Sequence, residues 1–238
     1  MTTERAIVLL SGGLDSSLAC LVERQKGREV TPLFIDYGQY PVEKERQSAK
    51  EFVRTQGLGP LIEMKIQLGT ERPIARSWGR TITLVGIACM WAGEQSIRYH
   101  TICTGGHEGD IGGDCKPGDF DKYLNLALSL STRSTFSFDL PIRHYTTEMV
   151  GQGLVNYQVD FRLLYNCYWD LPCGFKSEKD TYRCPGCRRK VIAMKAAGIQ
   201  DEELLAFPNK GLGGRVDQGS VSEEVTTQFF GRNSGVSR

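Results

Sequence analysis

Short apolar segments alternate with longer amphipathic ones through the first two thirds of the chain. Residues 6–10 form an unbroken apolar run, which is typical of a strand buried on both faces. Further strands are predicted at residues 30–35, 61–66 and 99–103. Helical spacing of apolar positions predicts helices at residues 18–27, 41–57, 82–92, 120–128 and 149–155. Strands alternating with helices predict an α/β fold with a mostly parallel, doubly wound sheet.

The pattern changes after residue 165. Cysteine, proline and aromatic residues dominate the stretch to residue 187, and short helices are expected at 188–197 and 201–207. From residue 211 the chain is rich in glycine, serine and charge. We therefore divide the sequence into an α/β domain at 1–165, a small helical element at 166–210, and a tail at 211–238 that is flexible or ordered by a partner.

Composition and charge exclude several classes of partner. The chain has 238 residues, of which 40% are hydrophobic and 24% charged, as in ordinary globular proteins. Its formal net charge is +1, so no overall field attracts nucleic acid or a membrane surface, and neither partner is expected. The first apolar run is too short for a signal peptide or a membrane span, which favours a cytoplasmic location.

A glycine- and serine-rich loop joins the first predicted strand to the first helix. Its glycines let the backbone approach an anion closely, and the N–H groups at the helix start favour negative charge. The serine hydroxyls can donate to phosphate oxygens, and Asp15 can hold Mg²⁺ or orient the loop. A plain turn with a helix cap is the alternative. The predicted ATP-binding residues are Leu10, Ser11, Gly12, Gly13, Leu14, Asp15, Ser16 and Ser17.

The sequence SGGLDSS after an N-terminal strand resembles the signature of the ATP pyrophosphatase superfamily, the PP-loop enzymes with an adenine nucleotide alpha hydrolase-like fold. The resemblance implies that ATP is cleaved between its α and β phosphates. A substrate oxygen becomes adenylated, and a nucleophile then displaces AMP. The loop lacks both the Gly-Lys-Ser/Thr end of a Walker loop and the spaced glycines of a dinucleotide fold.

Further motifs resemble one branch of this superfamily, the 7-cyano-7-deazaguanine synthases (the QueC family). They are DYGQ at 36–39, Gly79-Arg80 before an apolar helix, and a TGGHEGDIGGDCK segment at 104–116. The resemblance covers roughly residues 5–195 with gaps. The catalytic or substrate-binding residues that it implies are Asp36, Tyr37, Gln39, Arg80, Glu108, Asp110, Asp114 and Lys116.

The resemblance implies a ligase that forms C–N bonds. Its substrate would be 7-carboxy-7-deazaguanine, whose carboxylate is adenylated and attacked by ammonia to give an amide, which a second ATP dehydrates to the nitrile. By resemblance, Asp110 and Asp114 lie near the heterocycle or the magnesium, and Glu108 accepts a hydrogen bond from a base N–H. Arg80 and Lys116 would neutralise developing negative charge. The family also implies a homodimer.

The sequence departs from the family pattern on the predicted substrate side. The segment before residue 79 and the loop at 110–114 are both shorter than in the family. The family's Pro-Gly-Arg-Asn sequence is replaced by other residues in this chain. ATP use is therefore better supported than nitrile synthesis. The alternative is a diverged QueC-like enzyme of an antiphage defence system that transfers the activated acyl group to an amine on a protein.

The chain has eight cysteines, and four of them fall between residues 167 and 187. Four thiolates at this spacing suit a structural, tetrahedral Zn²⁺ site. A redox pair would explain the C-x₂-C at 184–187 but not the other two. The predicted zinc ligands are Cys167, Cys173, Cys184 and Cys187, and Cys173 departs most from the family spacing.

Two other classes of function remain open from the sequence. A PP-loop enzyme that thiolates tRNA would need a persulfide cysteine and an RNA-binding surface, which near-neutral charge disfavours. A catalytically inactive nucleotide- or zinc-binding protein is disfavoured by the intact loop at 11–17.

Overall fold

The fold is seen in a computed structural model, which describes residues 4–67, 79–95, 99–108, 119–132, 136–168, 184–206 and 209. Its centre is a five-stranded sheet in the order β3-β2-β1-β4-β5, in which every neighbouring pair is parallel. The predicted parallel α/β sheet is confirmed. The strands are β1 (Arg5–Leu9), β2 (Glu29–Asp36), β3 (Ile62–Lys65), β4 (Thr101–Cys103) and β5 (Ser137–Asp139).

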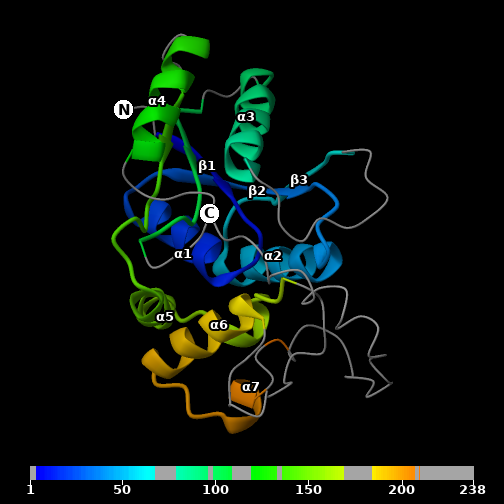
Figure 1. Cartoon of the computed structure of the whole chain (residues 1–238), viewed down its shortest axis with the longest axis vertical. Helices are drawn as coiled ribbons and strands as arrows, with labels where there is room; N and C mark the ends of the chain where they lie inside the picture. The colour runs from blue at the N-terminus through cyan, green and yellow to red at the C-terminus, as the bar shows by residue number, and fades with distance from the viewer. Residues whose placement is uncertain are drawn as a thin grey trace, which may run out of the picture.

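Helices cover both faces of the sheet (Figure 1). None of them, within the described ranges, is long and apolar enough to cross a membrane. The helices are α1 (Leu14–Gln25), α2 (Val42–Gln56), α3 (Arg80–Gly93), α4 (Asp119–Ser131), α5 (Thr147–Asn156), the 3₁₀ turn η1 (Phe161–Leu163), α6 (Pro185–Ala196) and α7 (Glu202–Ala206).

Two apolar cores lie on opposite sides of the sheet, because the buried strands direct alternate side chains to opposite faces. Ala6 and Val8 of β1 face the core under α1, α2, α5 and α6, whereas Ile7 faces the core under α3 and α4. This arrangement confirms the doubly wound fold. It also explains why residues 6–10 read as an unbroken apolar run.

The sequence pattern placed most elements within a few residues. Gly57 ends α2 in the left-handed conformation, with φ of 59°, as a glycine after a helix suggests. The pattern missed β5, whose three residues are too few to show a period, and it missed η1. Strand β4 is shorter than the predicted 99–103 because regular pairing begins at Thr101.

The cysteine-bearing C-terminal element shares the main core. Val191, Ala193 and Met194 of α6 are buried in the same cluster as α1 and α5. Helices α5 and α6 approach so closely that a Cβ on Gly151 would lie 2.0 Å from the backbone oxygen of Ala193. Helix α6 therefore packs as a continuation of the α/β domain.

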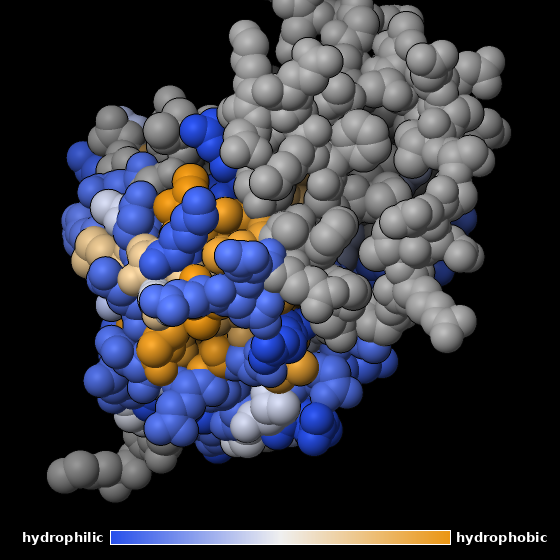
Figure 2. All heavy atoms as spheres, turned by 90° about the horizontal axis from the view of Figure 1, so that it is seen from below, coloured by the Kyte–Doolittle hydropathy of each residue, from blue (hydrophilic) through white to orange (hydrophobic). Residues whose placement is uncertain are grey.

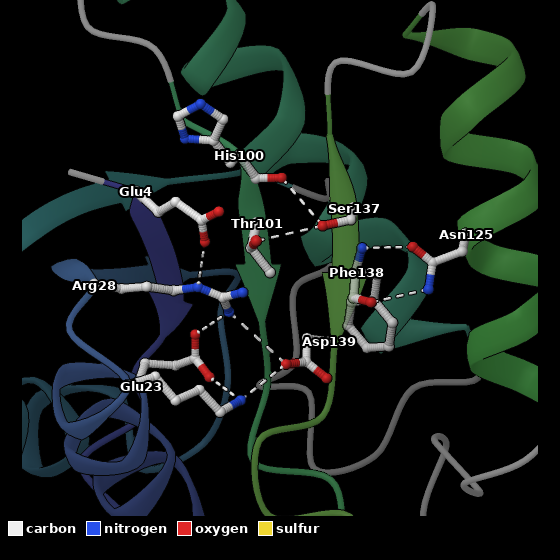
Figure 3. A network of polar contacts seen from close by, with 10 residues as sticks. Glu4, Glu23, Arg28, His100, Thr101, Asn125, Ser137, Phe138 and Asp139 are labelled. Carbon is white, nitrogen blue, oxygen red and sulfur yellow. Dashed lines mark hydrogen bonds and ion pairs between the residues drawn. The ribbon is translucent and has the colours of Figure 1, made fainter. Parts of the chain in front are cut away.

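A charge network around the buried Glu23 joins α1 to the sheet (Figure 3). The Glu23 side chain is fully buried, and its carboxylate accepts hydrogen bonds from Lys26 and Arg28, each at 2.6 Å. Lys26 also donates to Asp139 of β5 at 3.1 Å. Glu23, Cys103 and Asp139 lie close enough together to hold a metal ion, but the two cations already balance the carboxylates.

Replacing Gly151 by alanine is expected to destabilise the fold by roughly 1–3 kcal/mol, because the added methyl forces α5 away from α6. Thermal unfolding would show this as a fall in Tm. Gly86→Ala in α3 is the control, since a Cβ there meets nothing within 4 Å, and alanine should raise helix stability slightly. Equal Tm changes for the two variants would contradict the close helix contact.

Candidate functional site

A cavity of about 220 Å³ opens at the carboxyl ends of β1, β2 and β4. The strand order reverses between β1 and β4, and ligands of such sheets bind at this switch point. The floor consists of backbone and side chains that leave these strands. The residues that form it are Leu9, Leu10, Leu33, Phe34, Ile35, Thr104, Gly105 and Gly106.

Gly12 fixes the loop between β1 and α1 against α2. This glycine has φ of 77°, and a Cβ would lie 2.7 Å from the backbone nitrogen of Ala49. Its carbonyl oxygen accepts hydrogen bonds from Ser48 Oγ at 2.6 Å and from the N–H of Tyr165 at 3.0 Å. Glycine is therefore required both for the turn and for the close packing against α2.

The serines close the loop over the start of α1. Ser16 Oγ accepts from the N–H of Ser11 at 3.2 Å and lies 3.1 Å from Ser11 Oγ. The hydroxyls of Ser17 and Thr104 are buried and have no hydrogen-bond partner in the described part of the chain. Thr104 lines the cavity and Ser17 does not, so the Thr104 hydroxyl and the backbone N–H groups of the helix start form a donor-rich cradle for an anion.

Gly105 lies directly against this helix start. A Cβ at Gly105 would be 2.5 Å from the carbonyl carbon of Asp15 and 2.6 Å from the nitrogen of Ser16. Any other residue would therefore displace the loop or cover its N–H groups. The close contact with the loop after β1 is the reason why a glycine is needed after β4.

Asp15 is held among positively charged and polar groups at the cavity wall. Its carboxylate lies 3.3 Å from Nε2 of His107 and 3.6 Å from the guanidinium of Arg189. The His107 ring is buried, and its Nδ1 lies 2.9 Å from the Tyr145 carbonyl oxygen. Arg189 comes from α6 and also donates to the hydroxyl of Tyr168.

The wall beside α2 contains Tyr37, Gln39, Arg80 and Glu45. Gln39 is fixed because its side-chain oxygen accepts from the N–H of Tyr37 at 2.9 Å, while Nε2 donates to Glu45 at 3.0 Å. Arg80 begins α3 and lies 3.5 Å from the Tyr37 hydroxyl. Burial raises the pKa of Glu45 to about 7, although Gln39 and Arg80 oppose this shift.

Half of the sixteen residues predicted to bind ATP or substrate line this cavity, whereas Gly12, Leu14 and Ser17 belong to the same loop and helix start without lining it. Leu10, Ser11, Gly13, Asp15, Ser16, Tyr37, Gln39 and Arg80 line it. Asp36 instead pairs with Arg46 at 2.7 Å and accepts from the N–H of Gly38. Glu108 is exposed and lies 2.8 Å from His144. Asp110, Asp114 and Lys116 fall outside the described residues.

Three of the predicted zinc ligands converge. The sulfur atoms of Cys167, Cys184 and Cys187 lie within 4.8 Å of one another and are buried, and the cysteines are free of disulfides. A hydrogen bond with Cys167 is the largest cause that raises the pKa of Cys184. Cys173 falls outside the described residues.

Side chains that the sequence did not single out connect the cysteine cluster to the loop. Asn209 Nδ2 donates to Cys187 Sγ at 3.3 Å, and its Oδ1 accepts from the N–H of Asn166 at 3.0 Å. The Asn166 side chain in turn accepts from the N–H of Leu14 at 3.1 Å. No local pattern marks such contacts, because they join residues 22, 43 and 152 positions apart.

A second hollow of about 290 Å³ lies beside α5 and α7. The view from below shows apolar side chains exposed among polar ones on this side of the molecule (Figure 2). The charged residues that line this hollow include Arg162 and Asp201, which pair with each other at 2.8 Å. It contains none of the residues that the motifs single out.

Comparisons with known proteins agree with the motifs. The family model of the queuosine biosynthesis protein QueC matches residues 5–77. A 7-cyano-7-deazaguanine synthase of Pseudomonas putida is 25% identical, with 84% of this chain and 98% of the relative covered. The synthase of Geobacter sulfurreducens is 27% identical, with 89% and 98% covered.

Among solved structures, a predicted subunit of a tRNA methyltransferase from Methanocaldococcus jannaschii is 18% identical with a TM-score of 0.43, and 62% of this chain and 72% of that chain are covered. The alignments with these two synthases cover 98% of each relative's own length. The chain is therefore similar over most of its length to 7-cyano-7-deazaguanine synthases, and its first third matches the QueC family model.

Proposed function

We propose that this protein uses ATP to adenylate the carboxylate of 7-carboxy-7-deazaguanine and then transfers the acyl group to ammonia. The amide is the first product, and its dehydration with a second ATP would give the nitrile. The observation that carries the proposal is the common cavity of the phosphate loop, Arg80 and Arg189. Sequence similarity to proteins named 7-cyano-7-deazaguanine synthase supports the same substrate class.

The loop would bind the β and γ phosphates, and the cavity would hold the reacting carboxylate. N–H groups at the start of α1 and the hydroxyl of Thr104 can donate to phosphate oxygens. Arg80 and Arg189 would neutralise charge that develops at the α-phosphate and the acyl oxygen. Asp15 would hold the Mg²⁺ that accompanies ATP, which neutralises the departing pyrophosphate.

Purified protein with ATP, magnesium and 7-carboxy-7-deazaguanine is expected to catalyse ATP–pyrophosphate exchange that depends on the carboxylate. Gly105→Ala should lower the exchange rate by roughly 10²-fold, because the added Cβ displaces the N–H groups that face the phosphates. Gly86→Ala is the matched control and should retain exchange. A wild-type protein that exchanges nothing would overturn the proposed substrate.

Adding ammonium to the same reaction identifies the acceptor. Amide or nitrile among the small molecules is the outcome that supports ammonia. A mass added to a protein, with no amide formed, would identify the protein-conjugating alternative instead. Masses of intact proteins and of small molecules from one sample distinguish these results.

The cysteine cluster fits a structural Zn²⁺ ion. Three buried sulfurs within 4.8 Å of one another match the soft ligands that zinc prefers. Cys173 is the proposed fourth ligand. Arg188 and Arg189, on α6 next to Cys187, add positive charge near a thiolate site.

Wild-type protein is expected to contain one zinc ion per chain by atomic emission. Cys187→Ser should lose the metal and also weaken ATP binding, because the Cys187–Asn209–Asn166 contacts reach the N–H of Leu14. Cys89→Ser, at a buried thiol of α3 outside the cluster, is the control and should keep its zinc. Zinc-free wild-type protein from zinc-supplemented cells would contradict the site.

A homodimer is also proposed, through the outer faces of α3 and α4. Large apolar side chains are exposed there, at 75% for Met90, 62% for Tyr123 and 77% for Leu130. A monomer rarely presents several such side chains on two neighbouring helices. Contact with a second copy would bury them.

Light scattering on a size-exclusion column should report a dimer for the wild type and a monomer for Leu130→Glu. The introduced charge would be buried in the interface without a partner. Val155→Glu, at an exposed site on α5, should leave the dimer intact. A monomeric wild type at micromolar concentration would refute this surface.

A further inference from the structure

The geometry points to Glu45 as the proton acceptor for the attacking amine in the cavity. This inference rests on the proposed function, because it assigns a role within the second half of that reaction. Glu45 is one turn into α2, in a position that no motif of the sequence singled out. Only Asp15 and Glu45 supply carboxyl groups among the described residues that line the cavity.

The two carboxyl groups have different surroundings. Asp15 lies beside the loop, 3.6 Å from the Arg189 guanidinium and 3.3 Å from His107 Nε2. Glu45 lies beside Tyr37, Gln39 and Arg80 and has its hydrogen bond from a neutral amide. Asp15 is therefore suited to binding a cation, and Glu45 is suited to exchanging a proton.

Gln39 holds Glu45 in place. Its Nε2 donates both to the carbonyl oxygen of Ile35 at 3.2 Å and to Glu45 Oε2 at 3.0 Å. Its oxygen accepts from the N–H of Tyr37, so the amide cannot turn around without losing these contacts. One carboxylate oxygen is thus directed by Gln39, and the group lies on the wall of the cavity.

Burial and the neighbouring polar and charged groups act in opposite directions on the pKa of Glu45. Burial raises its pKa to about 7, while Gln39 and then Arg80 oppose this shift. The start of α2 also favours the carboxylate. Across the cavity lie Asp15 and Arg189 beside the loop, and Tyr37 shares the wall. A base whose pKa lies near the working pH is efficient in proton transfer.

The proposed step balances in atoms and charge. The nitrogen of ammonia attacks the acyl carbon of the adenylate, and the C–N bond forms as a tetrahedral intermediate with a positively charged nitrogen. The Glu45 carboxylate takes one proton from that nitrogen. The bond from the acyl carbon to the phosphate oxygen then breaks, and its electron pair leaves with AMP. The products are the amide, AMP and protonated Glu45, which returns its proton to solvent.

Glu45→Gln keeps the size of the side chain and a hydrogen-bond acceptor for Gln39 but removes the base. Its ATP–pyrophosphate exchange with 7-carboxy-7-deazaguanine is expected to stay near the wild-type rate, because adenylation needs no amine. Its amide formation from ammonia should fall roughly 10²-fold. Glu43→Gln is the matched control, since that carboxylate is on the same helix, is exposed and pairs with Arg46.

Two further readouts separate proton transfer from a structural role. Hydroxylamine is a weaker base than ammonia and enters neutral at pH 7, so its product should be less affected by Glu45→Gln than the amide is. At constant free ammonia, wild-type amide formation should decline as the pH falls below 7 and Glu45 gains its proton. The Glu45→Gln variant should not show this decline in amide formation below pH 7.

The outcomes distinguish the inference from the function on which it rests. Exchange by wild-type protein combined with normal amide formation by Glu45→Gln overturns the role of Glu45 and leaves adenylation intact. Equal loss of exchange and amide formation assigns Glu45 to ATP binding or folding, which also overturns it. Absence of exchange in the wild type removes the proposed function and the inference together.

Discussion

The fold of this protein depends on how the carbonyl oxygen of Gly12 is held. Ser48 of α2 and the N–H of Tyr165 both donate to this oxygen, and the same Ser48 hydroxyl lies 2.6 Å from the Leu163 carbonyl oxygen. Three segments far apart in sequence therefore meet beneath the loop. A loop fixed in this way keeps its N–H groups in place before a ligand arrives, and such preorganisation is what makes electrostatic stabilisation effective.

The C-terminal element completes this site as well as covering the core. Asn166 reaches Leu14 at the start of α1, and Arg189 reaches Asp15, so the residues around the cysteine cluster supply one wall of the cavity. Gly186 allows this contact, because a Cβ there would lie 1.8 Å from the Asn166 carbonyl oxygen. A metal that fixes the cysteines would therefore act on the loop between β1 and α1 through packing and hydrogen bonds, without lining the cavity itself.

The fold and the glycine-rich loop between β1 and α1 were predictable because their signals are local. The apolar run of β1 and the glycines at 12 and 13 fall in one short stretch, and the helix periods are long enough to read. Glu45, Asn166 and Arg189 were not predictable as site residues. Each is a common polar residue on an unremarkable stretch, and its role arises only when the fold brings distant segments to one sheet edge. β5 was missed for a simpler reason, since three residues carry no period.

The charges of the cavity are arranged in two pairs, and this division favours acyl transfer over simple nucleotide binding. Asp15 and Arg189 lie beside the loop, where ATP phosphates would need a cation and a counter-charge. Glu45 and Arg80 lie beside α2, where no phosphate group of the loop requires a carboxylate. A site that only bound ATP would gain nothing from a partly buried carboxyl group there, because burial of an ionisable group costs free energy. If the second reactant is an amine, this carboxyl group would accept its proton, and that role accounts for the free energy that its burial costs.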